Sequence, residues 1–341
     1  MKLQILAIVY FIFIFSVVFA AAQGGESVEQ EIASAQNLLK SGNPTGAINL
    51  LQTALKKNPD SEKLKYEIGK IFYAQGNYQQ AIENLSVSYG KFPQTSAEYK
   101  LAVRMQGLSH YVLGHLKDAI PFLEKVTEWE PYNNEFGYAL GVCYIQTRQP
   151  DKSRQSFANL FGVTTNSAAA YLLNAQMLIR QQFEETAEIE LNKALELDPK
   201  LPQVRSLLGE MAIYRAELDK GIDLLKQEIA LNPANSMAYY RLGEALTRQL
   251  KWDEAIAPLQ KSIWINPFFS GPYIVLGKVY FKKQDLGNAL NLLQRSVAID
   301  PKNFGAHYLL GQVLQQAGKT EEAKAEFTLA EQLRGSNDKN P

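Results

Sequence analysis

Cysteine is almost missing from this sequence. The 341 residues include one cysteine, Cys143, so no disulfide can form within the chain and its fold does not depend on oxidation. Cys143 comes just after the pair Leu140-Gly141 in an apolar stretch, where a small buried side chain is expected. We therefore predict that Cys143 belongs to the core and is not a reactive thiol.

Histidine is also scarce, and this argues against an enzyme. The three histidines are His110, His115 and His307, and they do not have the spacing of metal ligands. The sequence also has no nucleophile elbow and no phosphate-binding loop. His110 stands at a helix position that holds aromatic residues elsewhere in the chain, so we expect it to pack. The sequence predicts no catalytic residue, no metal site and no cofactor.

An excess of charge of one sign is the third feature that is missing. Lysine and arginine together number 35, and aspartate and glutamate together also number 35. A balanced chain has no net electrostatic attraction to nucleic acid or to an anionic membrane surface. The expected partners are therefore proteins and not nucleic acids.

A long apolar run does occur at the N-terminus. Residues 1–22 carry one basic residue, then about eighteen apolar residues, and end in three alanines. Ala20 and Ala22 stand at the two positions that a signal peptidase reads, which predicts a signal peptide, cleaved after Ala22, and a polar leader at 23–27. The alternative is an uncleaved membrane anchor over residues 3–22, because eighteen apolar residues can just span a bilayer. In both cases we expect the body of the chain outside the cytoplasm, either periplasmic or extracellular.

The remainder of the chain repeats itself at an interval of 34 residues. Three series of residues keep this interval: Pro199, Pro233, Pro267 and Pro301; Gly209, Gly243, Gly277 and Gly311; and Ala187, Gly221, Ala255, Ala289 and Ala323. Three series that share one period indicate an array of similar structural units.

Each unit has the pattern of two helices. In residues 236–267 the first half (239–250) and the second half (252–263) both place apolar residues three or four positions apart, which is helical spacing. The closing proline ends the second helix, because it lacks a backbone N–H and clashes with the preceding turn. Gly243 and Ala255 mark the places where the two backbones can approach closely. The unit is therefore predicted to be a helical hairpin.

These features together resemble the tetratricopeptide repeat. They are the 34-residue interval, the alanine of the second helix, the closing proline, and the recurring pairs Leu208-Gly209, Leu242-Gly243, Leu276-Gly277 and Leu310-Gly311. The chain as a whole is similar to exported, bacterial-type members of that family. The resemblance implies an all-α fold, a right-handed superhelical α-solenoid of antiparallel helix hairpins, with a concave inner face lined by the first helices.

About nine repeats are predicted, followed by a disordered polar tail at 335–341. Their expected boundaries are 28–61, 62–95, 96–133, 134–167, 168–201, 202–235, 236–269, 270–303 and 304–334. The third repeat contains a four-residue insertion in which Thr95 and Glu98 match a capping box, so its first helix should start one turn early. The fourth repeat lacks the closing proline, and a looser joint is expected at 161–166.

The resemblance also implies which side chains of the first helices face the concave groove. These are Tyr66, Lys70, Arg104, Tyr111, Tyr138, Arg180, Tyr214, Tyr240, Glu244, Arg248, Lys278, Phe281, Lys282, Tyr308 and Gln312. The set is aromatic and mildly basic, and tyrosine and arginine often anchor protein interfaces. The predicted site is a groove for an extended peptide or a helix of a partner protein. The alternative role for the tyrosines is packing between neighbouring helices.

The implied function is a non-catalytic scaffold for protein-protein interaction. The carboxylate clamp and the inner asparagine ladder that some members of the family carry are both missing from the equivalent positions. A second hypothesis is a membrane-anchored assembly factor for envelope or secretion machinery, which would keep its N-terminal segment. An intrinsic enzyme is disfavoured, because no domain outside the repeats is left to hold a catalytic centre.

Overall fold

The structure is a computed structural model that describes residues 27–337. The predicted signal peptide, its cleavage site at Ala20 and Ala22, and most of the leader lie outside the described residues. So do residues 338–341.

The described part of the chain is all-α, as the sequence predicted, and consists of eighteen α-helices with one short 3-10 helix. It divides into two compact units, of which the first ends at Thr165 and the second begins at Asn166. The boundary falls inside the stretch 161–166 that the sequence marked as a looser joint. In that stretch α9 ends at Phe161, and Gly162 caps it in the left-handed conformation.

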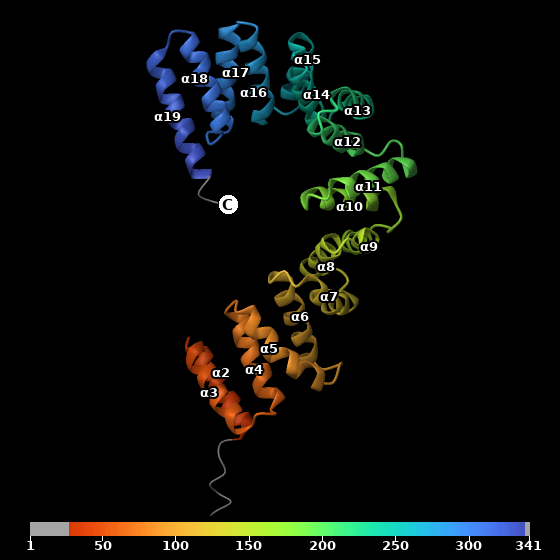
Figure 1. The fold of residues 1–341 in the computed structure, drawn as a ribbon, viewed down its shortest axis with the longest axis vertical. Helices are drawn as coiled ribbons and strands as arrows, with labels where there is room; N and C mark the ends of the chain where they lie inside the picture. Colours follow the sequence, from red (N-terminus) through yellow and green to blue (C-terminus); the bar gives the residue numbers. More distant parts are fainter. Residues whose placement is uncertain (1–26, 338–341) are drawn as a thin grey trace, which may run out of the picture. The chain divides into compact units, whose positions relative to one another are not determined.

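Unit 1 contains four hairpins, each made of a first and a second helix (Figure 1). The first helices are α2 (Val28–Lys40), α4 (Glu62–Ala74), α6 (Ala97–Val112) and α8 (Asn134–Gln146). The second helices are α3 (Pro44–Lys57), α5 (Tyr78–Ser88), α7 (Leu116–Trp129) and α9 (Pro150–Phe161), and the 3-10 helix η1 (Tyr89–Lys91) follows α5.

Unit 2 contains five hairpins of the same kind. The first helices are α10 (Ala168–Arg180), α12 (Val204–Tyr214), α14 (Ser236–Arg248), α16 (Ser270–Lys282) and α18 (Phe304–Gln316). The second helices are α11 (Glu184–Leu197), α13 (Leu218–Leu231), α15 (Trp252–Ile265), α17 (Leu286–Ile299) and α19 (Thr320–Asn337). In both units each helix packs on its neighbours in the chain, and successive first helices also touch from α2 to α8 and from α12 to α18.

A buried glycine lets the two helices of most hairpins pack closely. At Gly243 an added Cβ would lie 2.4 Å from Cγ of Leu259, which is fully buried on the second helix. The side chain closest to Gly243 is therefore that of Leu259 on α15. At Gly221 an added Cβ would lie 2.7 Å from Cγ1 of Ile213 and 2.9 Å from the backbone carbonyl oxygen of Gly209.

The turn inside each hairpin always uses one residue in the left-handed conformation. These residues have φ between 60° and 78° and are Gly42, Gly76, Gly114, Arg148, Gln182, Ala216, Leu250, Gln284 and Gly318. A side chain at such a position strains the backbone, because its Cβ comes too close to the following carbonyl oxygen. Five consecutive hairpins nevertheless have a residue other than glycine there.

The third hairpin has the early helix start that the insertion predicted, but with a different cap. Its first helix α6 is 16 residues long, against 13 for α4 and α8. The capping side chain is Ser96, whose hydroxyl accepts a hydrogen bond from the N–H of Tyr99, and not Thr95. The insertion also changes the preceding hairpin, where α5 has only 11 residues and η1 replaces its last turn.

Two further helix ends differ from the expected boundaries. Gln203 adopts a left-handed conformation with φ of 73°, so α12 begins only at Val204. At the other end of unit 2, α19 continues to Asn337. Residues 335–337 are therefore helical and do not belong to a disordered tail.

Cys143 is in the core, as predicted, and His110 is half-buried and packs against a neighbouring ring. Cys143 is buried, and this burial raises the pKa of its thiol to about 12. His110 stacks on Phe122 with 5.7 Å between ring centroids, and burial lowers its pKa. Over residues 27–337 we find no helix that is both long enough and apolar enough to cross a membrane.

Candidate partner-binding surfaces

The first helices of unit 1 form a surface that contains two cavities. We call the surface of α2, α4, α6 and α8 the first-helix face of unit 1. These helices follow one another in contact, so that side chains of three neighbouring helices can meet. One cavity of about 370 Å³ lies over α2, α4 and α6, and another of about 390 Å³ lies over α4, α6 and α8.

The second of these cavities is dominated by tyrosine, and we call it the tyrosine cavity. Its lining is Tyr73, Tyr78, Leu108, Tyr111, Val112, Asn134, Glu135, Tyr138 and Ala139. Tyr111 and Tyr138 belong to the predicted groove residues, and the structure brings them together. Tyr73 and Tyr78 were missed, and their rings meet edge to face with 5.8 Å between centroids.

The lining of the tyrosine cavity includes one carboxylate, that of Glu135, and no lysine or arginine. Burial raises the pKa of Tyr73, and the nearby charge of Glu135 raises it further. Burial also raises the pKa of Tyr111. These phenols therefore stay neutral at physiological pH, and their rings and hydroxyl groups are available for uncharged contacts.

The first cavity, which we call the lysine cavity, has a different chemistry. Its lining is Ile32, Lys63, Tyr66, Glu67, Lys70, Phe92, Ala97, Glu98 and Leu101. Tyr66 is buried and packs edge to face on Phe92 at 5.2 Å, so it has the packing role that the sequence left open. The Nζ atom of Lys70 lies 4.8 Å from the centroid of the Tyr66 ring and 2.7 Å from Glu67. Burial raises the pKa of Tyr66 to about 12, with the charges of Glu67 and Glu98 adding to the effect.

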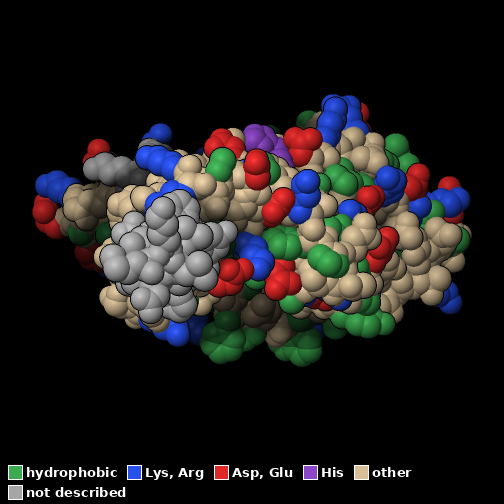
Figure 2. All heavy atoms as spheres, turned by 90° about the horizontal axis from the view of Figure 1, so that it is seen from below, with side chains coloured by type: hydrophobic (Ala, Val, Ile, Leu, Met, Phe, Trp, Pro, Cys, Tyr) green, Lys and Arg blue, Asp and Glu red, His purple; other side chains and the backbone are tan. Residues whose placement is uncertain are grey.

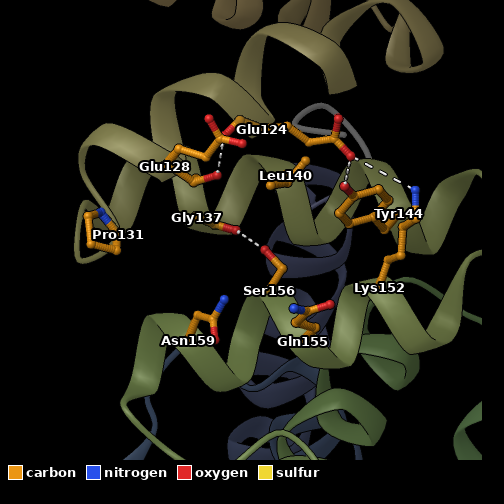
Figure 3. Close-up of a pocket in the computed structure, with 11 residues that line it drawn as sticks. Glu124, Glu128, Pro131, Gly137, Leu140, Tyr144, Lys152, Gln155, Ser156 and Asn159 are labelled. Atoms are coloured by element: carbon orange, nitrogen blue, oxygen red, sulfur yellow. Dashed lines mark hydrogen bonds and ion pairs between the residues drawn. The ribbon is translucent and has the colours of Figure 1, made fainter.

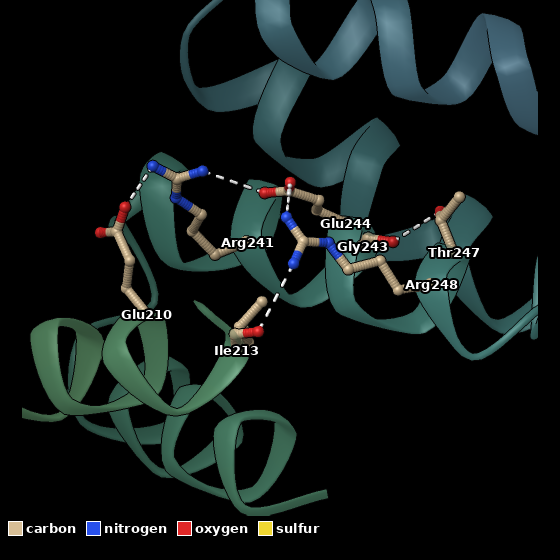
Figure 4. A network of polar contacts seen from close by, with 7 residues as sticks. All are labelled: Glu210, Ile213, Arg241, Gly243, Glu244, Thr247 and Arg248. Atoms are coloured by element: carbon tan, nitrogen blue, oxygen red, sulfur yellow. Dashed lines mark hydrogen bonds and ion pairs between the residues drawn. The ribbon is translucent and has the colours of Figure 1, made fainter. Parts of the chain in front are cut away.

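The corresponding face of unit 2 carries a network of ion pairs (Figure 4). Arg241 on α14 pairs with Glu210 on α12 and, at 2.9 Å, with Glu244 on its own helix. Arg248 pairs with Glu244 at 3.0 Å and donates a hydrogen bond of 3.4 Å to the carbonyl oxygen of Ile213. Two of the predicted groove residues, Glu244 and Arg248, are thus already bonded within the chain. Arg241 and Glu210 were not predicted.

The other predicted residues differ in how far solvent reaches them. Tyr240 is half-buried, with its ring 5.0 Å from that of Phe269 and 5.3 Å from the guanidinium carbon of Arg241. Arg104 on α6 forms an ion pair with Glu130. The exposed members of the set are Tyr138, Arg180, Tyr214, Arg248, Lys278, Lys282 and Tyr308, and Phe281 and Gln312 are half-buried. The set therefore offers exposed side chains in both units without forming one uniform site.

A third cavity, of about 520 Å³, lies between α7, α8 and α9 (Figure 3). Its polar groups largely satisfy one another. Ser156 donates a hydrogen bond of 3.1 Å to the carbonyl oxygen of Gly137, and Tyr144 donates to Glu124, which also lies 3.9 Å from Lys152. Burial, together with this contact to Glu124, raises the pKa of Tyr144. The cavity was not expected, since its lining comes mainly from helices outside the predicted face.

Charges of both signs are interspersed on the surface shown in Figure 2, with apolar side chains between them. This agrees with the balance of 35 basic and 35 acidic residues. A stack of helical hairpins with aromatic and polar first-helix faces is the architecture of a repeat scaffold for protein-protein interaction.

Comparison with known protein families identifies the family to which this chain belongs. The model described as tetratricopeptide repeat matches residues 32–95 and 207–268, and two further models of the same repeat match 277–318 and 304–337. Together these matches cover more than half of the chain. The chain belongs to the tetratricopeptide repeat proteins.

The chain is also similar to several known proteins over part of its length. The chain is 24% identical over 168 residues to the BBSome complex member BBS4 of Bos taurus, which is 49% of this chain and 31% of that protein. It is 27% identical over 120 residues to the intraflagellar transport protein 88 homolog of Homo sapiens, which is 34% of this chain and 14% of that protein. A solved structure of MamA from Desulfovibrio magneticus RS-1 is 22% identical, with a TM-score of 0.45, over 50% of this chain and 97% of that one. The chain thus spans less than a third of either curated relative.

Proposed function

We propose that the chain is a non-catalytic scaffold outside the cytoplasm that binds a peptide or helix of a partner protein on its first-helix faces. The observation that carries this proposal is the pair of cavities on the first-helix face of unit 1. Four predicted groove residues, Tyr66, Lys70, Tyr111 and Tyr138, line them. Rigid aromatic side chains in a recess provide contact area at a low cost in conformational entropy.

Partner capture tests the binding part of this proposal. We would prepare one variant in each unit, Tyr111→Ala/Tyr138→Ala and Tyr240→Ala/Arg248→Ala/Phe281→Ala, and use each as bait in envelope extracts beside the wild type. Loss of a captured protein in at least one variant, with unchanged helical content by circular dichroism, is the expected result. Lys226→Ala, an exposed substitution on the second helix α13, is the control. Capture that survives in both variants would show that the first-helix faces are not the site.

The proposed location rests on the sequence of residues 1–22. A basic residue, an apolar run and alanines at Ala20 and Ala22 are the pattern of a cleaved export signal. N-terminal sequencing of the mature protein, together with cell fractionation, tests it. A mature chain in the periplasm or medium that starts at Gln23 is the expected result, and a cytoplasmic chain that starts at Met1 contradicts it.

A membrane-anchored assembly factor is the second candidate. The apolar run is long enough to span a bilayer if it is retained, and one relative is by name a member of a complex. In that case the protein should sediment with membranes and keep its N-terminal segment. The same fractionation experiment therefore distinguishes the two candidates.

A further inference from the structure

We propose that the tyrosine cavity binds an arginine side chain of the partner segment. This inference rests on the proposed function, because it assigns the chemistry of the ligand at one of the proposed binding surfaces. In this arrangement the guanidinium group of the arginine lies against the tyrosine rings and pairs with the carboxylate of Glu135.

The first step is the composition of the lining. Four of the nine lining residues are tyrosines, one is the acidic Glu135, and none is lysine or arginine. The face of an aromatic ring carries negative charge density and attracts cations within about 6 Å of its centroid. Glu135 is exposed at the start of α8 and belongs to the lining of the cavity together with Tyr73. The lining is therefore complementary to a positive group.

The second step is a comparison with the lysine cavity on the same face. There the chain supplies its own cation, because Lys70 lies over the ring of Tyr66. Lys70 directly follows the repeat glycine Gly69, and the residue that follows Gly107 in the next hairpin is Leu108. Leu108 lines the tyrosine cavity. The tyrosine cavity thus has the aromatic and acidic groups of its neighbour without an internal cation.

The third step is the choice between arginine and other groups. A guanidinium group is planar and weakly hydrated, so it can stack on tyrosine rings while it donates two parallel hydrogen bonds to a carboxylate. An ammonium group is more strongly hydrated and has no flat face. The cavity, at about 390 Å³, also lies within the size range of side-chain and small-ligand sites. An extended partner segment with an exposed arginine therefore fits this cavity best.

Peptides of one design test the proposal. We would use a glycine-serine background with a single central arginine, lysine, glutamine or glutamate, and titrate each peptide into the full mature chain with ring-labelled tyrosines, followed by NMR. The arginine peptide should shift the resonances of Tyr73, Tyr78, Tyr111 and Tyr138. The lysine peptide should bind several-fold more weakly than the arginine peptide. The glutamine and glutamate peptides should bind more weakly by a factor of about ten or more. Equal shifts from the glutamine or glutamate peptide would overturn the proposal.

Two variants with matched controls locate the effect. Glu135→Gln and Tyr138→Ala should each weaken the arginine peptide about five- to tenfold. Glu128→Gln, an exposed carboxylate on α7, and Tyr308→Ala, which holds the register position of Tyr138 in unit 2, should leave its affinity unchanged. Because Glu135 is exposed, its amide variant keeps the fold even if Tyr138→Ala does not. Unchanged affinity in Glu135→Gln contradicts the proposed pairing.

The outcomes separate this inference from the proposed function. If partner capture requires Tyr111 and Tyr138 while the arginine peptide shows no preference, the scaffold proposal holds and the arginine inference fails. If the arginine peptide binds with the predicted sensitivity to Glu135→Gln while no variant affects partner capture, the cavity is a cation site and the proposed scaffold function fails.

Discussion

The two units are built from the same hairpin, yet their first-helix faces differ. Unit 1 departs from the strict repeat, with a lengthened α6, a shortened α5 and the extra helix η1, and its face contains two cavities. Unit 2 keeps the 34-residue interval in its glycines, alanines and prolines, and its face carries the ion-pair network around Arg241. On the first-helix faces, the irregular unit thus has recesses lined with aromatic residues, and the regular unit has a larger network of internal ion pairs.

This difference separates the features that both units share from one that belongs to unit 1. The glycine-to-leucine contact between the helices of a hairpin occurs in both units, for example at Gly107 and at Gly243. It is therefore part of the common scaffold. The tyrosine cavity occurs in unit 1 alone among the cavities described, and it requires tyrosines from α4, α5, α6 and α8 together. Tyr73 and Tyr111 also pack against the hydrophobic cores of unit 1, so this combination contributes to packing, and its role in recognition is our proposal.

The largest expected effect comes from overfilling the helix contact that both units share. In Gly141→Leu of unit 1 the new Cβ would lie 2.5 Å from the ring of Phe157, and in Gly243→Leu of unit 2 it would lie 2.4 Å from Leu259. We expect each variant to lose about 3 kcal/mol of the free energy of unfolding, measured by urea denaturation.

The control for this pair is Gly287→Ala on α17. An added Cβ there would find its nearest neighbour at 3.8 Å, so stability should stay the same or rise slightly. A midpoint that does not change in Gly141→Leu and Gly243→Leu would contradict the close packing in both units.

A smaller loss is expected from breaking the network that distinguishes unit 2. Arg241→Met leaves the partly buried carboxylates of Glu210 and Glu244 without this partner. We expect unit 2 to lose about 1 to 2 kcal/mol, and a second substitution, Glu210→Gln, to restore part of the loss. Arg180→Met, at an exposed position of α10, should change stability by less than about 0.5 kcal/mol. Equal effects of the two arginine substitutions would mean that the network adds no stability.

The sequence alone predicted the hairpins well, because they depend on local periodicity. Helical spacing, the repeat glycines and the closing prolines were enough to define the all-α fold, to place Cys143 in the core and to predict that His110 packs. The left-handed start of α12 at Gln203 could not be predicted, because it depends on contacts such as the hydrogen bond from the N–H of Gln203 to Glu228.

The candidate site was predicted only in part, because the prediction included only certain positions of the first helices. Tyr111 and Tyr138 were found because they belong to the expected positions on first helices. Tyr73 could have been found as well, since it follows Gly69 by four residues, as Tyr111 follows Gly107. Tyr78 begins a second helix, and Glu135 lies in the first turn of α8. Neither stands at one of the first-helix positions on which the prediction was based. Arg241 lies outside the predicted groove set, and its ion pair with Glu210 depends on how α12 and α14 pack.

Exchanging glycine and non-glycine residues at the left-handed turn positions of the two units should change the free energy of unfolding by about 1 kcal/mol. Leu250 in unit 2 has φ of 60° and a side chain that is 67% exposed, while Gly114 in unit 1 has φ of 75°. Leu250→Gly should raise the free energy of unfolding because it relieves strain at little loss of contact, and Gly114→Ala should lower it. Leu250→Ala keeps the strain and should give no gain. Thermal denaturation of the three variants tests this, and a loss of stability in Leu250→Gly would show that the turn is not strained.

The smallest effect concerns the one cysteine, which reports on unit 1 alone. The thiol of Cys143 keeps its proton in the folded chain to about pH 12, whereas in the unfolded chain it ionises around its ordinary pKa of about 9. Its contribution to stability is therefore complete below pH 9 and is lost as the pH rises towards 12. The free energy of unfolding of the wild type minus that of Cys143→Ala should therefore be about 0.8 kcal/mol lower at pH 9.5 than at pH 7. Urea denaturation of both proteins at the two pH values measures this change, and a difference that is independent of pH would mean that the thiol is open to solvent in unit 1.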